Sequence, residues 1–167
     1  MSKNIFKIAL VLIALFYFSS CGFKPMYKLT ENAIDFRSYS ITIMNGNDTS
    51  REIKEEIKRS FPSSSEIKKE YVIEINTDEN LEALITNTDG TVAKYKIEII
   101  INFKVKDNNK DSYLIEDMVR GFAQYTVETS EIESDDKRKR MIRNATSSAI
   151  QMMISKIQSD TSITNDN

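Results

Sequence analysis

The segment TVAKYKIEIIINFKVK, residues 91–106, decides the fold of this chain. Its odd-numbered positions from Ala93 to Val105 are apolar throughout, whereas most even-numbered positions from Lys94 to Lys106 are charged or polar. Successive side chains of a β-strand point to opposite faces of the sheet. The alternation therefore predicts one long strand with a buried face and a face in contact with water.

A second extended segment precedes this strand. Tyr71, Ile73 and Ile75 share one face, and residues 81–86 continue the segment after a polar interruption. Residues 87–90, Asn-Thr-Asp-Gly, separate the two segments, and an Asp-Gly pair adopts the positive φ values that a tight hairpin requires. The pattern predicts an antiparallel hairpin.

A third extended segment, residues 112–129, follows a polar turn. Its odd positions are mainly apolar, with Tyr113 and Ile115 at its start. A turn centred near Asn109 would place Glu98 opposite Arg120 and bring the two apolar faces together. A slip of one residue would turn one apolar face into water, so the pairing parity is well specified.

Two amphipathic helices complete the pattern. Thr49 and Glu52 form a capping-box motif before a helix from Ser50 to about Phe61. Ser134 and the two aspartates after it predict the start of a second helix that extends to about Gln158, since such residues cap N–H groups and oppose the helix dipole. This second helix carries the apolar stripe Ile142, Thr146, Ala149, Ile150, Met153, Ile154 and Ile157.

Together with a short strand at residues 39–44, these segments give the order β-α-β-β-β-α. We predict an α+β fold in which two helices pack on one face of a four-stranded, mostly antiparallel sheet. The domain should span residues 37–159. Residues 160–167 are polar and should form a disordered tail.

The N-terminus has the pattern of a secretion signal. Lys3 and Lys7 precede an apolar run, and the run ends before Ser19, Ser20 and Cys21. The run is shorter than the about 20 apolar residues that a transmembrane anchor needs, which favours a cleaved signal at residues 1–20. Residues 21–36 would then connect the new N-terminus to the domain.

Cys21 resembles the acylated cysteine of a bacterial lipobox, although Phe18 stands where lipoboxes usually carry Leu. The resemblance implies a diacylglyceryl group on the sulfur and an acyl chain, such as palmitate, on the new N-terminus. Several acyl chains anchor a protein stably, whereas one alone is marginal. Gly22 is not the Asp of an inner-membrane retention signal, which favours the outer membrane.

Composition excludes several functional classes. The chain has no histidine and a single cysteine, so nucleophile pairs that need His, and zinc sites built on His or Cys, are excluded. The predicted signal holds two lysines and no acid, which leaves 21 basic against 25 acidic residues in the remainder. That balance gives no basic surplus for nucleic acid. We expect no cofactor, no metal and no enzymatic activity.

The residues Cys-Gly-Phe-Lys-Pro-Met-Tyr at positions 21–27 carry a family resemblance. They resemble the start of alphaproteobacterial LptE, the lipopolysaccharide-assembly lipoprotein, and the element order and the tyrosines at 71 and 125 agree in outline. The resemblance implies a non-enzymatic outer-membrane lipoprotein with two helices over a sheet. Such proteins plug the LptD β-barrel, help it assemble and take part in delivering lipopolysaccharide to the cell surface.

The candidate site for an anionic ligand is the polar face of the central strand. It comprises Lys94, Lys96, Lys104 and Lys106, with Arg120 beside them. Lipid A phosphates would suit such a stripe, but lysines are also ordinary on a solvated sheet face. The basic run at residues 137–143 has the same two interpretations, a partner contact or an exposed helix surface, and the second is favoured.

Two other functions stay open. One is an auxiliary periplasmic lipoprotein of an ABC-type lipid transport system, which would co-purify with an inner-membrane transporter instead of a barrel. The other is a carboxylate-dependent hydrolase, which would need converging acids such as Glu116 and Asp117.

The lipid anchor can be tested directly. Cys21→Ala removes the sulfur that accepts the diacylglyceryl group, so the variant should incorporate no labelled palmitate in growing cells. The measurement is autoradiography of the immunoprecipitated protein. Labelling that persists in the variant would refute the anchor.

Overall fold

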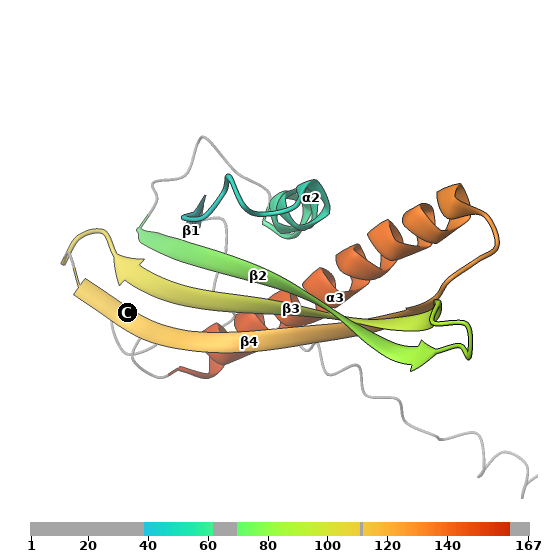
Figure 1. Ribbon diagram of the computed structural model, residues 1–167. Coiled ribbons are helices and arrows are strands. Elements are labelled where there is room, and N and C mark those ends of the chain that lie inside the picture. The colour runs from blue at the N-terminus through green and yellow to red at the C-terminus, as the bar shows by residue number, and fades with distance from the viewer. Residues whose placement is uncertain (1–38, 62–69, 111, 161–167) are drawn as a thin grey trace, which may run out of the picture. The chain divides into compact units, whose positions relative to one another are not determined.

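Three long antiparallel strands dominate the structure, a computed structural model that describes residues 39–61, 70–110 and 112–160 (Figure 1). The sheet order is β1-β2-β3-β4, and β1 runs parallel to β2 while the other neighbours are antiparallel. The elements are β1 (Tyr39–Ile43), α2 (Arg51–Ser60), β2 (Tyr71–Thr86), β3 (Val92–Asp107), β4 (Ser112–Thr126) and α3 (Glu131–Ser159). The predicted α+β class and element order are confirmed. The predicted signal with Cys21, the connector up to residue 36 and the tail from residue 161 lie outside the described residues.

Both helices pack on the same side of the sheet (Figure 1). The odd-numbered side chains of β3 form the centre of the core: Ile97, Ile99 and Ile101 are fully buried, as is Val105. Ile53 and Ile57 of α2 and seven residues of α3 close this core from the other side. The alternation in residues 91–106 thus corresponds to the predicted strand with one buried face, because burying one face of a strand requires every second residue to be apolar.

The β2–β3 hairpin is longer than its interrupted pattern suggested. β2 is continuous through the polar residues 76–80, because each pairs with β3 across the sheet. The turn at residues 87–90 is confirmed, with Gly90 at φ +85°. Tyr71 stacks on Tyr39 with 4.8 Å between ring centroids, and Tyr125 stacks on Tyr95 at 5.4 Å, so both tyrosines pair across strands.

The pairing of β3 with β4 keeps the predicted parity but is shifted by two residues. Arg120 lies opposite Ile100 instead of Glu98. One residue of the shift comes from the turn, whose centre is displaced because the carboxylate of Asp107 accepts the N–H groups of Asn109 and Lys110. The other comes from a β-bulge beside Val105.

The bulge corrects the predicted placement of Tyr113. Beyond the bulge Tyr113 pairs with Lys106, and the residue is 54% exposed instead of buried beside Ile115. Leu114 packs against the core in its place. An extra residue in one strand reverses the face of the sheet to which each side chain beyond it points.

Both predicted helix starts need correction. Thr49 does not cap α2; its hydroxyl contacts Asn45 and lies 2.8 Å from the Thr77 hydroxyl. Ser50 occupies the N-cap position of α2 without a side-chain hydrogen bond. α3 begins at Glu131, not Ser134, because the Ser130 side chain accepts a hydrogen bond from the N–H of Glu133 and caps the helix one turn earlier.

Helix α3 approaches β4 most closely at Gly121. A Cβ atom at this position would lie 1.8 Å from the carbonyl oxygen of Ala145 and 2.9 Å from the backbone nitrogen of Ala149. Both alanines are fully buried. The glycine and the two alanines thus allow the helix backbone to rest directly on the strand backbone.

Gly121→Ala should therefore destabilise the domain strongly. The added methyl group has to displace α3, and overpacking of this kind costs about 3 kcal/mol. We expect the Tm to fall by on the order of 10 °C in thermal unfolding followed by circular dichroism.

Gly46→Ala is the matched control for this substitution. A Cβ at Gly46 would have only an ordinary contact, 3.5 Å from the Ile43 carbonyl oxygen. Its Tm should stay near that of the unchanged protein. Equal Tm values for the two variants would contradict the close approach.

Candidate functional site

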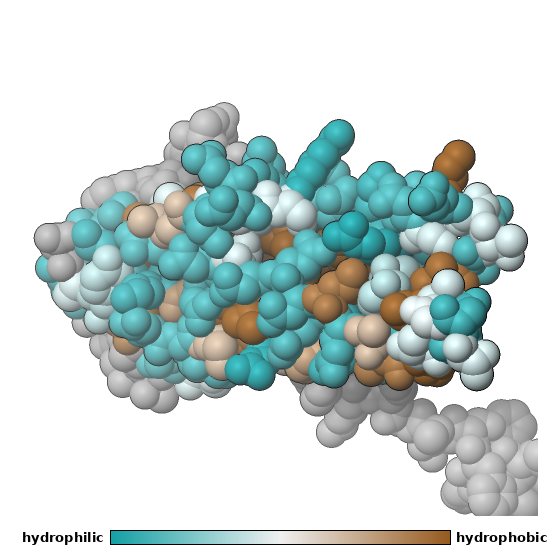
Figure 2. Space-filling view, viewed as in Figure 1, coloured by the Kyte–Doolittle hydropathy of each residue, from teal (hydrophilic) through white to brown (hydrophobic). Residues whose placement is uncertain are grey.

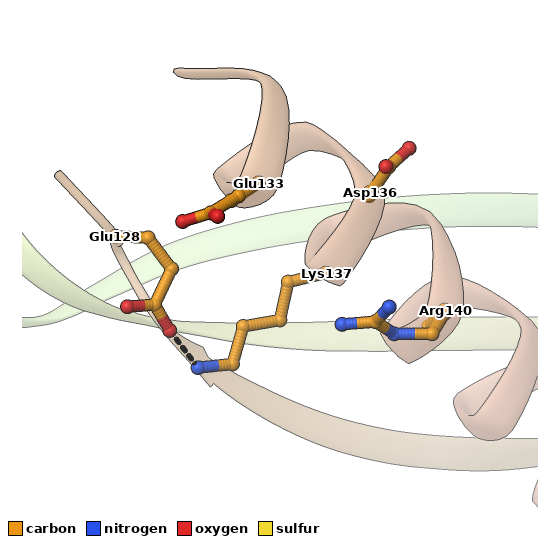
Figure 3. Close-up of a pocket in the computed structure, with 5 residues that line it drawn as sticks. All are labelled: Glu128, Glu133, Asp136, Lys137 and Arg140. Atoms are coloured by element: carbon orange, nitrogen blue, oxygen red, sulfur yellow. Dashed lines mark hydrogen bonds and ion pairs between the residues drawn. The ribbon is translucent and has the colours of Figure 1, made fainter. Parts of the chain in front are cut away.

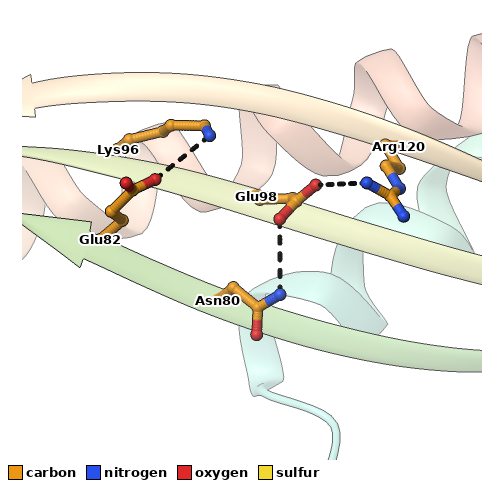
Figure 4. Close-up of polar contacts among 5 residues, drawn as sticks. All are labelled: Asn80, Glu82, Lys96, Glu98 and Arg120. Atoms are coloured by element: carbon orange, nitrogen blue, oxygen red, sulfur yellow. Dashed lines mark hydrogen bonds and ion pairs between the residues drawn. The ribbon is translucent and has the colours of Figure 1, made fainter.

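The predicted lysine stripe lies on the side of the sheet turned away from both helices, here called the outer face (Figure 4). Strand β3 places it there because its odd-numbered side chains occupy the core and its even-numbered side chains must point the other way. The outer face includes Glu74, Asp78, Asn80 and Glu82 of β2, Lys94, Lys96, Glu98, Ile100, Lys104 and Lys106 of β3, and Tyr113, Glu116, Met118, Arg120 and Phe122 of β4.

Acidic residues neutralise most of the stripe. The Lys96 ammonium lies 3.2 Å from the carboxylate of Glu82, and the Arg120 guanidinium lies 3.4 Å from that of Glu98 (Figure 4). Asn80 donates a further hydrogen bond of 3.4 Å to Glu98. The outer face therefore carries alternating charges instead of a uniform positive field.

Lys104 repeats this arrangement at the other end of β3. Its ammonium lies 2.8 Å from the carboxylate of Glu116, and that hydrogen bond raises the pKa of the lysine. Lys104 and Lys106 also lie 5.5 Å and 5.9 Å from the centre of the Tyr113 ring. Tyr113 in turn donates a hydrogen bond of 3.2 Å to Glu74.

Lys94 differs from its neighbours. It lies beside the β2–β3 turn, opposite Ile85 and Thr126, and has no ion-pair partner within the described part of the chain. Exposed ion pairs such as Lys96–Glu82 contribute about 0–1 kcal/mol each. An anionic ligand could therefore engage Lys94 directly and replace Glu82 as the partner of Lys96 at small cost.

Exposed apolar side chains lie between these charges (Figure 2). Phe122 is 51% exposed, and the Lys96 ammonium lies 5.3 Å from its ring centre. Met118 is exposed on the same strand. Their even numbers in β4 already placed them outside the core, and sequence reasoning missed them because it considered only the charged residues there.

The two acids considered for a hydrolase do not converge. Glu116 pairs with Lys104 on the outer face. Asp117, the next residue along the strand, pairs with Lys156 of α3 at 2.5 Å. The hydrogen bond from Lys156 holds the pKa of Asp117 below its usual value, which is the opposite of what a general acid requires.

The basic run at the start of α3 is mostly paired. Lys137 contacts Glu128, Arg138 lies 3.1 Å from Glu79, and Lys139 lies 2.5 Å from Asp135. These pairs agree with the interpretation as an exposed helix surface. Asp135 does not cap the helix as predicted, since it lies inside α3 and forms an ion pair.

A shallow pocket beside this run combines both charges (Figure 3). It is lined by Glu128, Glu133, Asp136, Lys137 and Arg140, and the side chains of Glu128 and Lys137 pair across it. Across residues 39–61, 70–110 and 112–160, no cluster of three or more His, Cys, Asp or Glu residues could hold a metal ion. Within the same ranges, no helix has the length and apolar character needed to span a bilayer.

The same architecture occurs in bacterial lipoproteins of solved structure. Lipoprotein B from Nitrosomonas europaea superposes with a TM-score of 0.56 at 13% identity, covering 78% of this chain and 88% of that one. A minor lipoprotein from Acinetobacter baumannii gives 0.53 at 9% identity, covering 77% and 95%. Rare lipoprotein B from Shewanella oneidensis gives 0.50 at 12% identity, covering 77% and 98%. A search among curated proteins found no match.

Two helices over one face of a mixed four-stranded sheet give the chain the fold of these small lipoprotein domains. The family model described as LptE, lipopolysaccharide-assembly, matches residues 36–157. The chain belongs to this family. It is accordingly a non-enzymatic lipoprotein of the cell envelope with a role in lipopolysaccharide assembly.

Proposed function

We propose that this chain is an outer-membrane lipoprotein, anchored through acylated Cys21, that partners an LptD-type β-barrel. In that role it supports barrel assembly and delivery of lipopolysaccharide to the cell surface, with its domain on the periplasmic side of the membrane or within the barrel lumen. Membership in the LptE family is the observation that carries the proposal.

The surface of the domain supports a role by contact. The two helices cover one side of the sheet, while the outer face keeps Phe122, Met118 and Tyr113 at least 39% exposed. Aromatic residues and Met are enriched where proteins meet. A sheet face with neutralised charges and exposed aromatic rings suits a partner whose wall is also polar, and the interiors of outer-membrane barrels are polar.

The partnership can be tested by co-purification. Affinity-tagged, full-length lipoprotein, extracted in mild detergent from outer membranes of its own bacterium, should retain the LptD-type barrel in a stoichiometric complex. Quantitative mass spectrometry of the purified sample measures the ratio. Recovery of an inner-membrane ABC transporter in place of the barrel would instead support the auxiliary transport role.

We also propose that the basic side chains of the outer face contact lipopolysaccharide phosphates, with Lys94 and Lys96 as the principal pair and Lys104, Lys106 and Arg120 as further contacts. Lys94 has no ion-pair partner in the described part of the chain, and Lys96 can exchange its exposed partner. The two lysines lie on the same face of β3 and could both reach one phosphate group.

Reversal of both charges tests this contact. Lys94→Glu with Lys96→Glu should weaken binding of the purified protein to lipopolysaccharide by about tenfold or more, since each charge-assisted hydrogen bond contributes about 1.5–3 kcal/mol. Binding can be measured by fluorescence anisotropy of labelled lipopolysaccharide. Lys139→Glu with Arg140→Glu on α3 makes the same change in net charge away from the sheet, and it should bind normally. Equal binding by both double variants would remove the stripe as the site.

A further inference from the structure

Strand β2 leaves most of its outer edge without a neighbouring strand. Its sixteen residues reach from Tyr71 to Thr86, but β1 pairs only with residues 71–75. The remainder extends toward the β2–β3 turn as a border of the sheet (Figure 1).

The side chain of Asn45 ends the β1–β2 ladder. Its amide nitrogen donates to the Thr77 carbonyl at 2.7 Å, and its amide oxygen accepts from the Thr77 N–H at 3.0 Å. The side chain thus takes the place of one more strand residue. Both backbone groups of Thr77 point toward this edge. Because every second residue of a strand directs its N–H and C=O to the same side, the backbone groups of Glu79, Leu81 and Ala83 also point toward this edge.

No described residue hydrogen-bonds to the backbone of Glu79, Leu81 or Ala83 on that side. We call these residues, Glu79–Ala83, the open edge. Exposed edges are normally protected by lysine, proline or a bulge. The open edge contains neither lysine nor proline, and the nearest bulge begins only after Ala83.

The opposite border of the sheet is protected. On β4 the Lys156 ammonium of α3 binds the carbonyl oxygen of Met118 at 3.1 Å and the carboxylate of Asp117. One charged side chain therefore blocks the middle of that edge. At the β2 border, Arg138 of α3 pairs with the carboxylate of Glu79 at 3.1 Å, but no described residue binds the outward backbone groups of Glu79, Leu81 or Ala83.

Apolar side chains flank the open edge. Leu81, Leu84 and Ile85 are 45%, 40% and 52% exposed; Leu81 lies in the regular part of β2, and the other two lie at the bulge that follows Ala83. An added strand would cover them as it paired with the backbone. Figure 2 shows apolar side chains gathered toward the end of the sheet that carries the β2–β3 turn.

The charge of the open edge selects its occupant. Three acids lie in or directly beside the open edge: Glu79 pairs with Arg138 of α3 and Glu82 pairs with Lys96, whereas Asp78 has no ion-pair partner in the described part of the chain. A second copy of this edge would bring another Asp78 and no unpaired base, so it would offer this carboxylate no complementary charge. A basic, partly apolar segment is complementary.

We propose that the open edge accepts an extended, basic segment of the β-barrel partner as an added strand. This proposal rests on the proposed function. A closed barrel has no free strand edge, so the segment comes from a loop or a terminal extension of the barrel protein, with an apolar side chain over Leu81 and a basic side chain near Asp78.

Hydrogen exchange of the intact complex provides the direct test. In the free lipoprotein, the amides of Glu79, Leu81 and Ala83 should exchange rapidly, because they face outward. In the complex with the purified LptD-type barrel they should become protected, as measured by mass spectrometry of peptides that cover residues 77–85. Unchanged exchange in a complex that does form would overturn the proposal and leave the proposed function intact.

Leu81→Pro removes one outward N–H and leaves the β2–β3 ladder unchanged, since proline is tolerated at such edge positions. It should weaken barrel binding by about tenfold. Leu81→Ala removes most of the side chain but keeps the backbone N–H, so it distinguishes the two contributions. It should bind more tightly than Leu81→Pro. Gln124→Pro is the matched control, because the even-numbered amides of β4 face outward at the other border, and it should bind as the unchanged protein does.

The outcomes are distinct. Failure of the unchanged lipoprotein to bind the barrel would overturn the proposed function. Normal binding together with equal affinity for Leu81→Pro and Gln124→Pro would overturn only the open edge as the site. A free protein that is dimeric by light scattering and becomes monomeric on Leu81→Pro would identify a second copy as the occupant and overturn the barrel segment.

Discussion

The direct contact between the backbone of α3 and the backbone of β4 at Gly121 is the constraint on which the rest of the structure depends. No side chain fits between them, since a Cβ at Gly121 would overlap the Ala145 carbonyl oxygen. The approach seats Ala145 and Ala149 on the strand, and it sets the helix so that Ile142, Ile150 and Met153 reach the centre of the sheet. The dispersion attraction between packed atoms falls steeply when even a small gap separates them. A helix held even slightly farther away would leave that core loosely packed.

Because both helices pack on one face of the sheet, the outer face and the sheet edges remain exposed. The outer face has no covering layer in the described structure, so it must be stable in water, and its alternating acids and bases achieve this. Because the ion pairs are exposed, each contributes little to stability. They instead keep the face soluble while leaving aromatic rings exposed between them. The resulting surface suits recognition more than chemistry, in agreement with a family whose members act without catalysis.

The sequence allowed the class, element order and core parity to be predicted, because alternation over sixteen residues leaves few interpretations. It failed where one side chain replaces a backbone partner. Asn45 and Thr49 had the pattern of a loop and a cap, yet they bind the edge of β2. The bulge beside Val105 was also missed, because the apolar residues at the odd positions 113 and 115 gave no sign of an extra residue between them. The lysine stripe was located correctly, but its ion pairs depended on which acids β2 and β4 bring alongside, and the register set those.

The two edges of the sheet differ in whether a side chain binds their outward backbone groups, and this difference has a physical consequence. An unprotected edge exposes N–H and C=O groups that pair with any extended chain, so it endangers a protein that stays free in solution. Lys156 removes this hazard at β4. At β2, Asn45 stops the ladder just where the acidic residues begin. Glu79 and Glu82 are ion-paired, and the remaining carboxylate of Asp78 does not block pairing as lysine or proline would. It favours pairing with basic segments over pairing with copies of the same edge. Such a bias retains the ability to bind a strand while reducing aggregation, and that combination is useful only if a particular strand is supplied by a partner.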